Sequence, residues 1–317
     1  METPALLHLH PDVTAARQAG LPIVALESTL IAHGLPWPLN LETARAAETA
    51  IRDAGAVPAT IAVWQGRPTI GLDAQQLEAL AQAPDVLKAS RRDLAIAIAQ
   101  ERTAATTVAA TMFLAHRAGI RLIATGGIGG AHRPPAPPWD ISADLTELAR
   151  TPIAVVCAGA KSILDIPRTL EILETNGVPV VGYRTDDFPP FLLCSSGQPV
   201  NARVDSPAEA SALLSAHWEL GGAGVVLAQP LPAEAALDPR EFAADLASAE
   251  SLASAAGIRG PAWTPFLLAR LAEISGGKTL QANQVLVIAN ARLAGEVARE
   301  VQIRIEHQEK LKIADTR

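Results

Sequence analysis

The chain alternates short apolar runs with stretches of helical periodicity. Apolar runs rich in Val, Ile, Leu and Ala, bounded by Gly, Pro or polar residues, are typical of buried strands. The predicted strands cover 22–26, 57–65, 120–125, 153–158, 178–183 and 223–230. Residues 66–72, "GRPTIGL", are predicted to form a hairpin with the strand over 57–65.

Apolar residues between these strands recur at the helical spacing. The alternation of strands and helices predicts a layered α/β/α fold with a central, mainly parallel sheet. From Pro232 the pattern becomes nearly all helical, and a long amphipathic stretch runs from 279 to about 308. We therefore predict one α/β domain over residues 1–317, with an N-terminal extension over about 1–18 and a helical C-terminal layer over about 232–317. The predicted helices cover 40–54, 73–83, 93–100, 105–118, 164–176 and 206–219, with a further helix after Ser142.

Composition limits the functions that this fold can serve. Hydrophobic residues make up 49% of the chain and charged residues 19%, which is typical of a globular protein. A net charge of −7 argues against a broad nucleic-acid surface but allows a local cationic pocket for a small anion. The N-terminus lacks a signal-peptide pattern and no apolar run is long enough to span a bilayer, so we expect a soluble cytoplasmic protein. The two cysteines, Cys157 and Cys194, are predicted to be buried free thiols.

Chemically capable residues follow three of the predicted strands directly. They are Glu27, the glycine-rich stretch 126–130 and Lys161. Ligand sites in parallel α/β sheets lie at the carboxyl ends of the strands, so we expect these three features to lie close together.

Lys161 is unusual because the chain has five lysines against 21 arginines. The residue does not belong to a phosphate-binding P-loop, since Val155 and Ala160 stand where that motif needs glycines. A lysine desolvated at a strand end can lose its proton and attack a carbonyl to form a Schiff base. The alternative is a lysine that reaches solvent or pairs with Asp165.

Two further segments offer charged groups of different kinds. Glu27 can be a carboxyl of raised pKa that serves as a general acid, or an acid that interacts with backbone amides at a helix start. His33 is interpreted as structural or loop-exposed. Residues 88–93, "KASRRD", can hold a phosphate or form an ordinary solvated surface.

Asp140 and Asp144 stand four residues apart around a predicted helix start. Such carboxylates suit a hard divalent cation, or they cap the helix. The sequence has no His/Cys spacing typical of zinc. The glycine stretch does not match a dinucleotide-binding fingerprint, but glycines allow backbone to approach a ligand closely.

Taken together and in order, these motifs resemble the pseudouridine-5′-phosphate glycosidase family, also called pseudouridylate synthase or indigoidine synthase A-like. The resemblance covers about residues 20 to 300. It rests on "ALESTLIAHGLPWPLN", "GAVPATIAV", "SRRDL", "ATTVAATM", "ATGGIGGAHR", "DISADLTELA", "VVCAGAKSILD", "GVPVVGY" and "TPFLLARLAEISGGKTLQAN".

The resemblance implies reversible cleavage of the carbon–carbon glycosidic bond of pseudouridine 5′-phosphate to uracil and ribose 5-phosphate. It implies Mn²⁺ as a cofactor, one ion per subunit, and a homotrimer. The family's covalent lysine falls on Lys161, its acid on Glu27 and its metal-binding aspartate on Asp140. The substrate-binding positions that it implies are Lys88, Val108, Ser142, Ala143 and Asp144, and we add Thr107, His132 and Asn283 as pocket members.

The sequence departs from the family in places. Pro-Pro-Ala-Pro-Pro fills 134–138 after His-Arg, where relatives usually carry a Gly-Ala-Glu-type stretch. Pro261 replaces a common lysine, and "VIANA" keeps only Asn290 of a usual asparagine pair. Two rival functions remain: a Schiff-base lyase or aldolase acting on another sugar phosphate, and a non-catalytic sugar-phosphate-binding protein.

Overall fold

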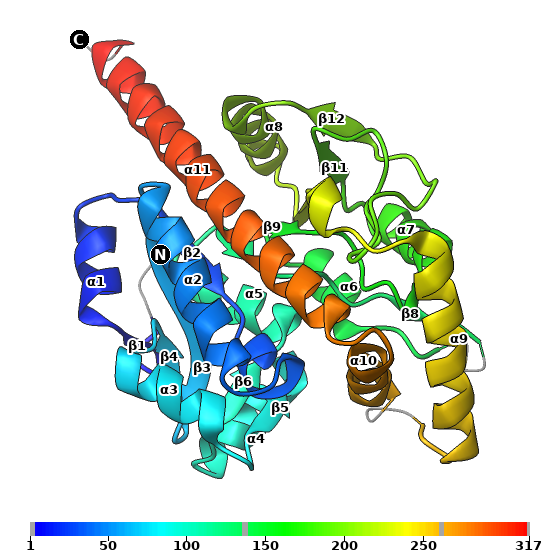
Figure 1. Ribbon diagram of the computed structural model, residues 1–317. Helices are drawn as coiled ribbons and strands as arrows, with labels where there is room; N and C mark the ends of the chain where they lie inside the picture. The colour runs from blue at the N-terminus through cyan, green and yellow to red at the C-terminus, as the bar shows by residue number, and fades with distance from the viewer. Residues whose placement is uncertain (1–3, 135–138, 260–262, 316–317) are drawn as a thin grey trace.

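A computed structural model describes residues 4–134, 139–259 and 263–315. It confirms the α/β prediction, with a mainly parallel central sheet and helices packed on it (Figure 1). Residues 135–138 of the proline-rich segment and Pro261 lie outside the described residues. Across the described ranges, no helix is long and apolar enough to cross a membrane.

The sheet has the strand order β1-β4-β3-β2-β7-β9-β13-β11-β12, and β6 attaches β5 to β3. All neighbouring strands are parallel except where β3 pairs with β4 and with β6. A separate antiparallel pair is formed by β8 and β10. The strands are β1 (His8–Leu9), β2 (Ile23–Leu26), β3 (Val57–Trp64), β4 (Arg67–Ile70), β5 (Leu87–Ala89), β6 (Ala104–Thr106), β7 (Leu122–Ala124), β8 (Ala131–His132), β9 (Ala154–Cys157), β10 (Leu164–Asp165), β11 (Val180–Tyr183), β12 (Ala202–Val204) and β13 (Val225–Ala228).

The predicted hairpin is confirmed. Trp64 faces Arg67 across a two-residue turn, in which Gln65 and Gly66 have φ of 48° and 76°. Two consecutive positive φ angles define the turn type that matches the twist of antiparallel strands.

Helices occupy most of the predicted positions. They are α1 (Pro11–Gln18), α2 (Leu39–Asp53), α3 (Ala74–Gln82), α4 (Leu94–Ala99), α5 (Val108–Arg117), α6 (Ala143–Leu148), α7 (Ile166–Thr175), α8 (Pro207–Glu219), α9 (Pro239–Ala255), α10 (Trp263–Ile274) and α11 (Lys278–Asp315). Two helix starts were predicted too early, because 104–106 and 164–165 pair as strands before α5 and α7 begin. Short helical turns occur at η1 (Leu30–Gly34), η2 (Arg91–Asp93) and η3 (Ala233–Ala235).

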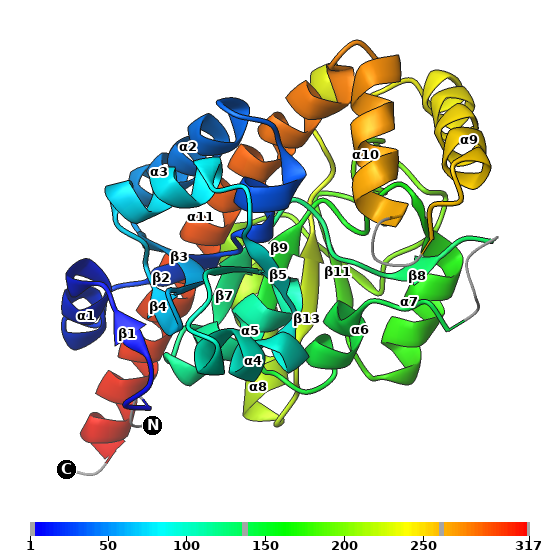
Figure 2. The same cartoon turned by 90° about the horizontal axis from the view of Figure 1, so that it is seen from below.

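Helix α11 runs across one face of the sheet and packs between α2 and α8 (Figure 1). It contacts β2, β7 and β9 on the way, while α5 packs against β2, β3, β6 and β7 (Figure 2). The N-terminal segment also joins the fold, since β1 pairs with β4 and α1 buries Val13 and Ala16.

The two cysteines differ in environment. Cys157 ends β9 in the core, and burial raises the pKa of its thiol to about 12. Cys194 is exposed, so the prediction that both thiols are buried was wrong for this residue. The apolar run before Cys194 was misleading, because Phe191 and Leu192 are buried while the chain then turns outward.

A glycine allows α11 to approach α2 closely. A Cβ atom on Gly295 of α11 would lie 2.7 Å from the Cβ of Ala54 and 3.2 Å from the carbonyl oxygen of Ile51. The absent side chain therefore allows α11 to pack closely on the C-terminal end of α2.

We predict that Gly295→Ala lowers the melting temperature although alanine is the better helix former. Overpacking at a close helix contact costs about 1–3 kcal/mol. Thermal unfolding checks this, and Gly295→Ala combined with Ala54→Gly should recover part of the loss. An increase in melting temperature for the single variant would contradict the close packing.

Candidate active site

A cavity of about 1360 Å³ opens at the carboxyl ends of the central strands. The chain connects β2 to β3 in one direction along the sheet and β7 to β9 in the other, so the strand order reverses between β2 and β7. Such a reversal leaves a crevice in which ligands bind. Predicted site residues that line the cavity are Glu27, Lys88, Thr107, Val108, His132, Asp140, Ser142, Ala143, Asp144 and Lys161.

Asn283 is the predicted pocket member that does not line the cavity. It lies near the start of α11, half-buried, and its Oδ1 atom has no hydrogen-bond partner among the described residues. His33 is also outside the cavity lining. It is exposed, as its interpretation from the sequence allowed, but it lies in the helical turn η1 and not in a loop.

The C-terminal helices form a cavity wall that sequence reasoning missed. Ser254, Ile258 and Arg259 at the end of α9, and Trp263 and Thr264 at the start of α10, line the cavity. The helical pattern of these segments predicts that one face packs on the protein. It does not predict that this face covers the cavity.

Glu27 directly follows β2, and its carboxylate accepts a hydrogen bond from the hydroxyl of Thr125. Burial raises the pKa of Glu27, while Lys161 and the Thr125 hydrogen bond oppose the shift. Among the described residues, the Glu27 carboxylate accepts from Thr125 and not from a backbone amide of the helical turn that begins at Leu30, which argues against the helix-start alternative. A carboxyl of raised pKa in a cavity has the character of a general acid.

Asn290 of α11 fixes the backbone beside this carboxyl. Its side chain is 1% exposed and donates from Nδ2 to the carbonyl oxygens of Thr125 and Gly126, at 2.9 and 3.4 Å. The residue that presents a hydroxyl to Glu27 is therefore held by the helix that crosses the sheet.

Lys161 lies four residues beyond β9, on an irregular extension of that strand. Its backbone amide donates to the carbonyl of Ile128 at 3.2 Å, and its side chain is half-buried. Lys161 makes no ion pair within the described chain. The alternative pairing with Asp165 was wrong, because that carboxylate caps α7 by accepting from the Arg168 amide at 3.1 Å.

Of the three cations in "KASRRD", two are engaged by neighbouring groups. Arg91 donates to the buried carboxylate of Glu147 at 2.8 and 3.1 Å and stacks over the ring of Phe113. Arg92 pairs with Asp93 at 3.3 Å. Lys88 has no ion pair within the described ranges, so it is the member of this cluster that is available to a ligand anion.

Lys88 is exposed inside the cavity, and its pKa is lowered by partial burial and by the positive charge of Lys161, against the attraction of Glu27 and Asp144. Two cations and one acid of raised pKa therefore share one electrostatic environment. An anionic ligand would relieve the repulsion between the cations.

Asp144 is buried and holds two backbone segments together. Its carboxylate accepts from the amides of Ala109 at 2.9 Å and Gly129 at 2.8 Å. A Cβ atom on Gly129 would lie 2.2 Å from the Ser142 hydroxyl oxygen, so the glycine permits this close approach. Ser142, and neither aspartate, caps α6. The capping alternative was therefore wrong for Asp140 and Asp144.

Asp140 and His132 lie on neighbouring backbone segments, since the His132 amide donates to the Asp140 carbonyl at 3.0 Å. Burial lowers the pKa of His132, Lys161 and Lys88 lower it further, and Asp140 opposes them. The Nδ1 atom of His132 is buried without a partner in the described part of the chain. A neutral imidazole with an unsatisfied nitrogen at a cavity wall suits hydrogen bonding to a ligand.

The donor set around Asp140 fits a weakly held hard cation. The described residues contain no group of three or more His, Cys, Asp or Glu side chains arranged to hold a metal. Both oxygens of Asp144 are occupied by amides, which leaves the half-buried carboxylate of Asp140 as the available oxygen ligand on this segment. Mg²⁺-like ions commonly bind through one carboxylate, with water and substrate phosphate completing the shell.

Thr107 and Val108 contribute the start of α5. The Thr107 side chain caps the helix by accepting from the Ala110 amide at 3.4 Å, and Val108 is the first helical residue. A helix N-terminus carries partial positive charge, which favours anions at this wall of the cavity.

The model of the family described as "Indigoidine synthase A like protein" matches residues 12–300 of the chain. A curated pseudouridine-5′-phosphate glycosidase of Methylobacterium nodulans is 55% identical over 294 residues, covering 92% of this chain and 87% of its own. Another of that name, from Herpetosiphon aurantiacus, is 54% identical over 293 residues, covering 92% of this chain and 97% of its own.

Solved structures also resemble this chain over nearly its whole length. The prealnumycin C-glycosynthase AlnA in complex with ribulose 5-phosphate superposes with a TM-score of 0.88 at 39% identity, covering 96% of this chain and 99% of its own. An indigoidine synthase A-like protein of Thermotoga maritima gives a TM-score of 0.85 at 33% identity, covering 95% and 99%. The match over nearly the whole chain shows that it belongs to the indigoidine synthase A-like family.

Proposed function

We propose that this protein is a pseudouridine-5′-phosphate glycosidase that reversibly cleaves pseudouridine 5′-phosphate to uracil and ribose 5-phosphate. One observation carries the proposal: Lys161 and Glu27, from β9 and β2 on either side of β7, line the same cavity. The names of the relatives at 55% and 54% identity support the substrate.

A carbon–carbon glycoside lacks a leaving-group heteroatom, so the usual pair of glycosidase carboxylates does not suffice. In the proposed reaction, the Nζ atom of Lys161 bonds to C1′ while the C1′–O4′ bond breaks, and O4′ takes the proton that Nζ gives up. The sugar is then an open chain attached to the enzyme through nitrogen. Arginine cannot replace this group, because it does not lose its proton.

The second step breaks the bond to the base. The nitrogen lone pair forms a C1′=N double bond, the C1′–C5 electron pair stays with uracil, and Glu27 supplies the proton that C5 takes up. The raised pKa of Glu27 supports this role, because it keeps the carboxyl protonated at higher pH than an exposed glutamate. Water then hydrolyses the iminium to ribose 5-phosphate and free Lys161.

The remaining cavity groups bind and orient the substrate in this proposal. Lys88 and the first turn of α5 at Thr107 and Val108 favour the phosphate. His132 offers an unsatisfied nitrogen. Ser142 and Ala143 line the same wall. A bound Mn²⁺ would be held by Asp140 and would supply Lewis-acid polarisation and charge neutralisation for the sugar phosphate.

A Schiff-base lyase acting on another sugar phosphate is the second candidate. It is favoured by the AlnA structure, a relative that carries ribulose 5-phosphate. Release of uracil from pseudouridine 5′-phosphate, measured beside a panel of other sugar phosphates, separates the two activities. A non-catalytic binding protein is the weaker alternative, because Lys161, Glu27 and Asp140 are all present in the cavity lining.

Our proposal includes a homotrimer, as the family resemblance implies, and a cytoplasmic location. Light scattering of the purified protein tests the oligomeric state, and fractionation of the host cell tests the location.

We predict that Lys161→Ala lowers turnover by at least about a thousandfold while binding of the substrate stays measurable, because the covalent route is lost. Uracil release and isothermal titration measure the two effects. Trapping of the wild-type protein with ribose 5-phosphate and borohydride should label Lys161. Turnover like that of the wild type would refute the covalent role.

We predict that Asp140→Ala makes activity very low and insensitive to added Mn²⁺, because its carboxylate is the available oxygen ligand. The measurement is uracil release across a Mn²⁺ titration after chelation. An unchanged Mn²⁺ response would remove Asp140 from the metal site.

We predict that kcat/KM for cleavage falls as pH rises through the raised pKa of Glu27, because the protonated carboxyl is the active form. Thr125→Val removes a hydrogen bond that stabilises the carboxylate, so the alkaline limb of the profile should move to higher pH. A profile that moves to lower pH, or does not move, would contradict Glu27 as the acid.

A further inference from the structure

The backbone segment that carries Lys161 lies between two other segments. On one side the glycine stretch runs beside it, and the Ile128 amide donates to the Gly159 carbonyl at 2.9 Å. On the other side, residues 189–192 run antiparallel to it, and the Phe191 amide donates to the Ala158 carbonyl at 2.8 Å. The second segment belongs to the connection between β11 and β12, which we call the 184–201 loop.

Ser162, directly after Lys161, forms two hydrogen bonds to this loop. Its side chain is 4% exposed, and its hydroxyl donates to the Pro190 carbonyl at 2.6 Å and accepts from the Leu192 amide at 3.1 Å. From the other direction, Arg133 donates to the carbonyls of Ser162 and Leu164, at 3.3 and 2.8 Å. The residue after Lys161 is therefore held on both sides.

The 184–201 loop packs closely against Gly159 and Gly127, on the two segments that flank the cavity. Gly159 has φ of +77°, and a Cβ atom there would lie 1.7 Å from the Pro189 carbonyl oxygen. Phe191, with φ of +63°, places its ring where a Cβ atom on Gly127 would be 2.7 Å away. A phenylalanine rarely adopts positive φ, and such strain persists only where the surroundings enforce it.

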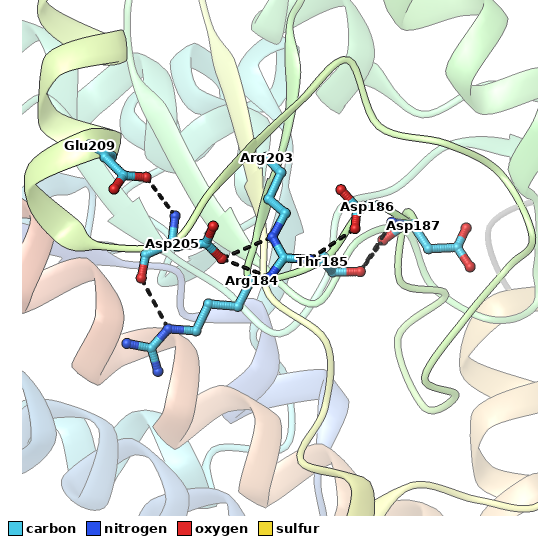
Figure 3. A network of polar contacts seen from close by, with 7 residues as sticks. All are labelled: Arg184, Thr185, Asp186, Asp187, Arg203, Asp205 and Glu209. Carbon is cyan, nitrogen blue, oxygen red and sulfur yellow. Dashed lines mark hydrogen bonds and ion pairs between the residues drawn. The ribbon is translucent and has the colours of Figure 1, made fainter.

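A polar network holds the base of the 184–201 loop (Figure 3). Arg203 of β12 pairs with Asp186 and with Asp205, each at 2.8 Å. The Thr185 hydroxyl donates to the Asp187 carbonyl at 2.9 Å within the loop. None of these residues lines the cavity, so the network is not explained by contact with a ligand.

We infer that Ser162 is a positioning residue for Lys161, and that the 184–201 loop is the brace through which it acts. The inference rests on the proposed role of Lys161 as the nucleophile. A reacting amine must lie about 3–3.5 Å from the carbon it attacks, and a displacement of 1 Å can cost a hundredfold in rate. Because the lysine side chain is long and makes no ion pair within the described residues, the position of its backbone decides where the amine can reach.

The test compares Ser162→Ala with Ser196→Ala. The Ser196 hydroxyl makes two similar hydrogen bonds in the same loop, donating to the Phe188 carbonyl at 2.5 Å and accepting from the Gln198 amide at 3.3 Å. Neither of these two bonds involves the segment of Lys161. Both variants lose hydrogen bonds in the loop, but only Ser162→Ala releases the Lys161 segment.

The readout is the rate at which Lys161 is trapped by ribose 5-phosphate and cyanoborohydride, followed by intact mass. In that reaction the amine bonds to the aldehyde carbon, the carbonyl oxygen leaves as water, and hydride reduces the iminium. We expect Ser162→Ala to slow trapping and kcat by about ten- to a hundredfold with little change in KM. Ser196→Ala should stay within about twofold of the wild type in both rates.

Trapping of Ser162→Ala at the wild-type rate would overturn the inference, and so would equal slowing in both serine variants, which indicates a general effect of loop stability. If the wild type itself forms no adduct, the proposed function fails instead. If Ser162→Ala does not fold, Ser162→Cys keeps the side-chain volume with weaker hydrogen bonds, and an unchanged trapping rate in that variant would also count against positioning.

Discussion

The site depends on one geometric constraint: neighbouring parallel strands end at the same edge of the sheet. β2, β7 and β9 are adjacent, and the residues that leave their carboxyl ends are Glu27, the glycine stretch and the Lys161 segment. Their sequence separation is large, but the sheet brings them into one cavity. The backbone hydrogen bonds of the strands thus determine which charged groups face each other, before any side chain contributes.

Some charged side chains of that cavity have an ion-pair or hydrogen-bond partner in the protein, and others have none. Arg91 and Arg92 have carboxylate partners, and Asp144 is held by two amides. Lys88 and Lys161 have no carboxylate at ion-pair distance within the described residues. Partial burial lowers the pKa of Lys88, and the positive charge of Lys161 lowers it further. The groups with partners maintain the shape of the cavity, and the groups without them are available for chemistry. A motif that is rich in cations, such as residues 88–93, therefore does not by itself predict how many of them can bind a ligand.

The sequence predicted β2, β3, β4, β7, β9, β11 and β13, because apolar runs such as that of β9 have a simple local cause. It missed the short strands β1, β5, β6, β8, β10 and β12. It also predicted that Glu27, the glycine stretch and Lys161 would meet, since the strand-end rule is a property of the fold class. It could not predict the contacts of Asp144 or the exposure of Cys194, because these depend on which distant segment packs nearby. The wall formed by α9 and α10 was missed for the same reason. Residues 154–157 could be predicted as a strand from their own apolar character. The role of Ser162 could not, because its two hydrogen-bond partners lie 28 and 30 residues further along the chain.

The position of Asn290 has a consequence for the order in which the molecule is made. A ribosome releases β2, β7 and β9 well before α11, yet the backbone at Thr125 and Gly126 is hydrogen-bonded by a side chain of that helix. During synthesis the nascent chain can form most of its sheet while the carbonyl groups beside Glu27 still lack their final partner. The Thr125 hydroxyl that donates to Glu27 would then reach its final position late, when α11 settles between α2 and α8.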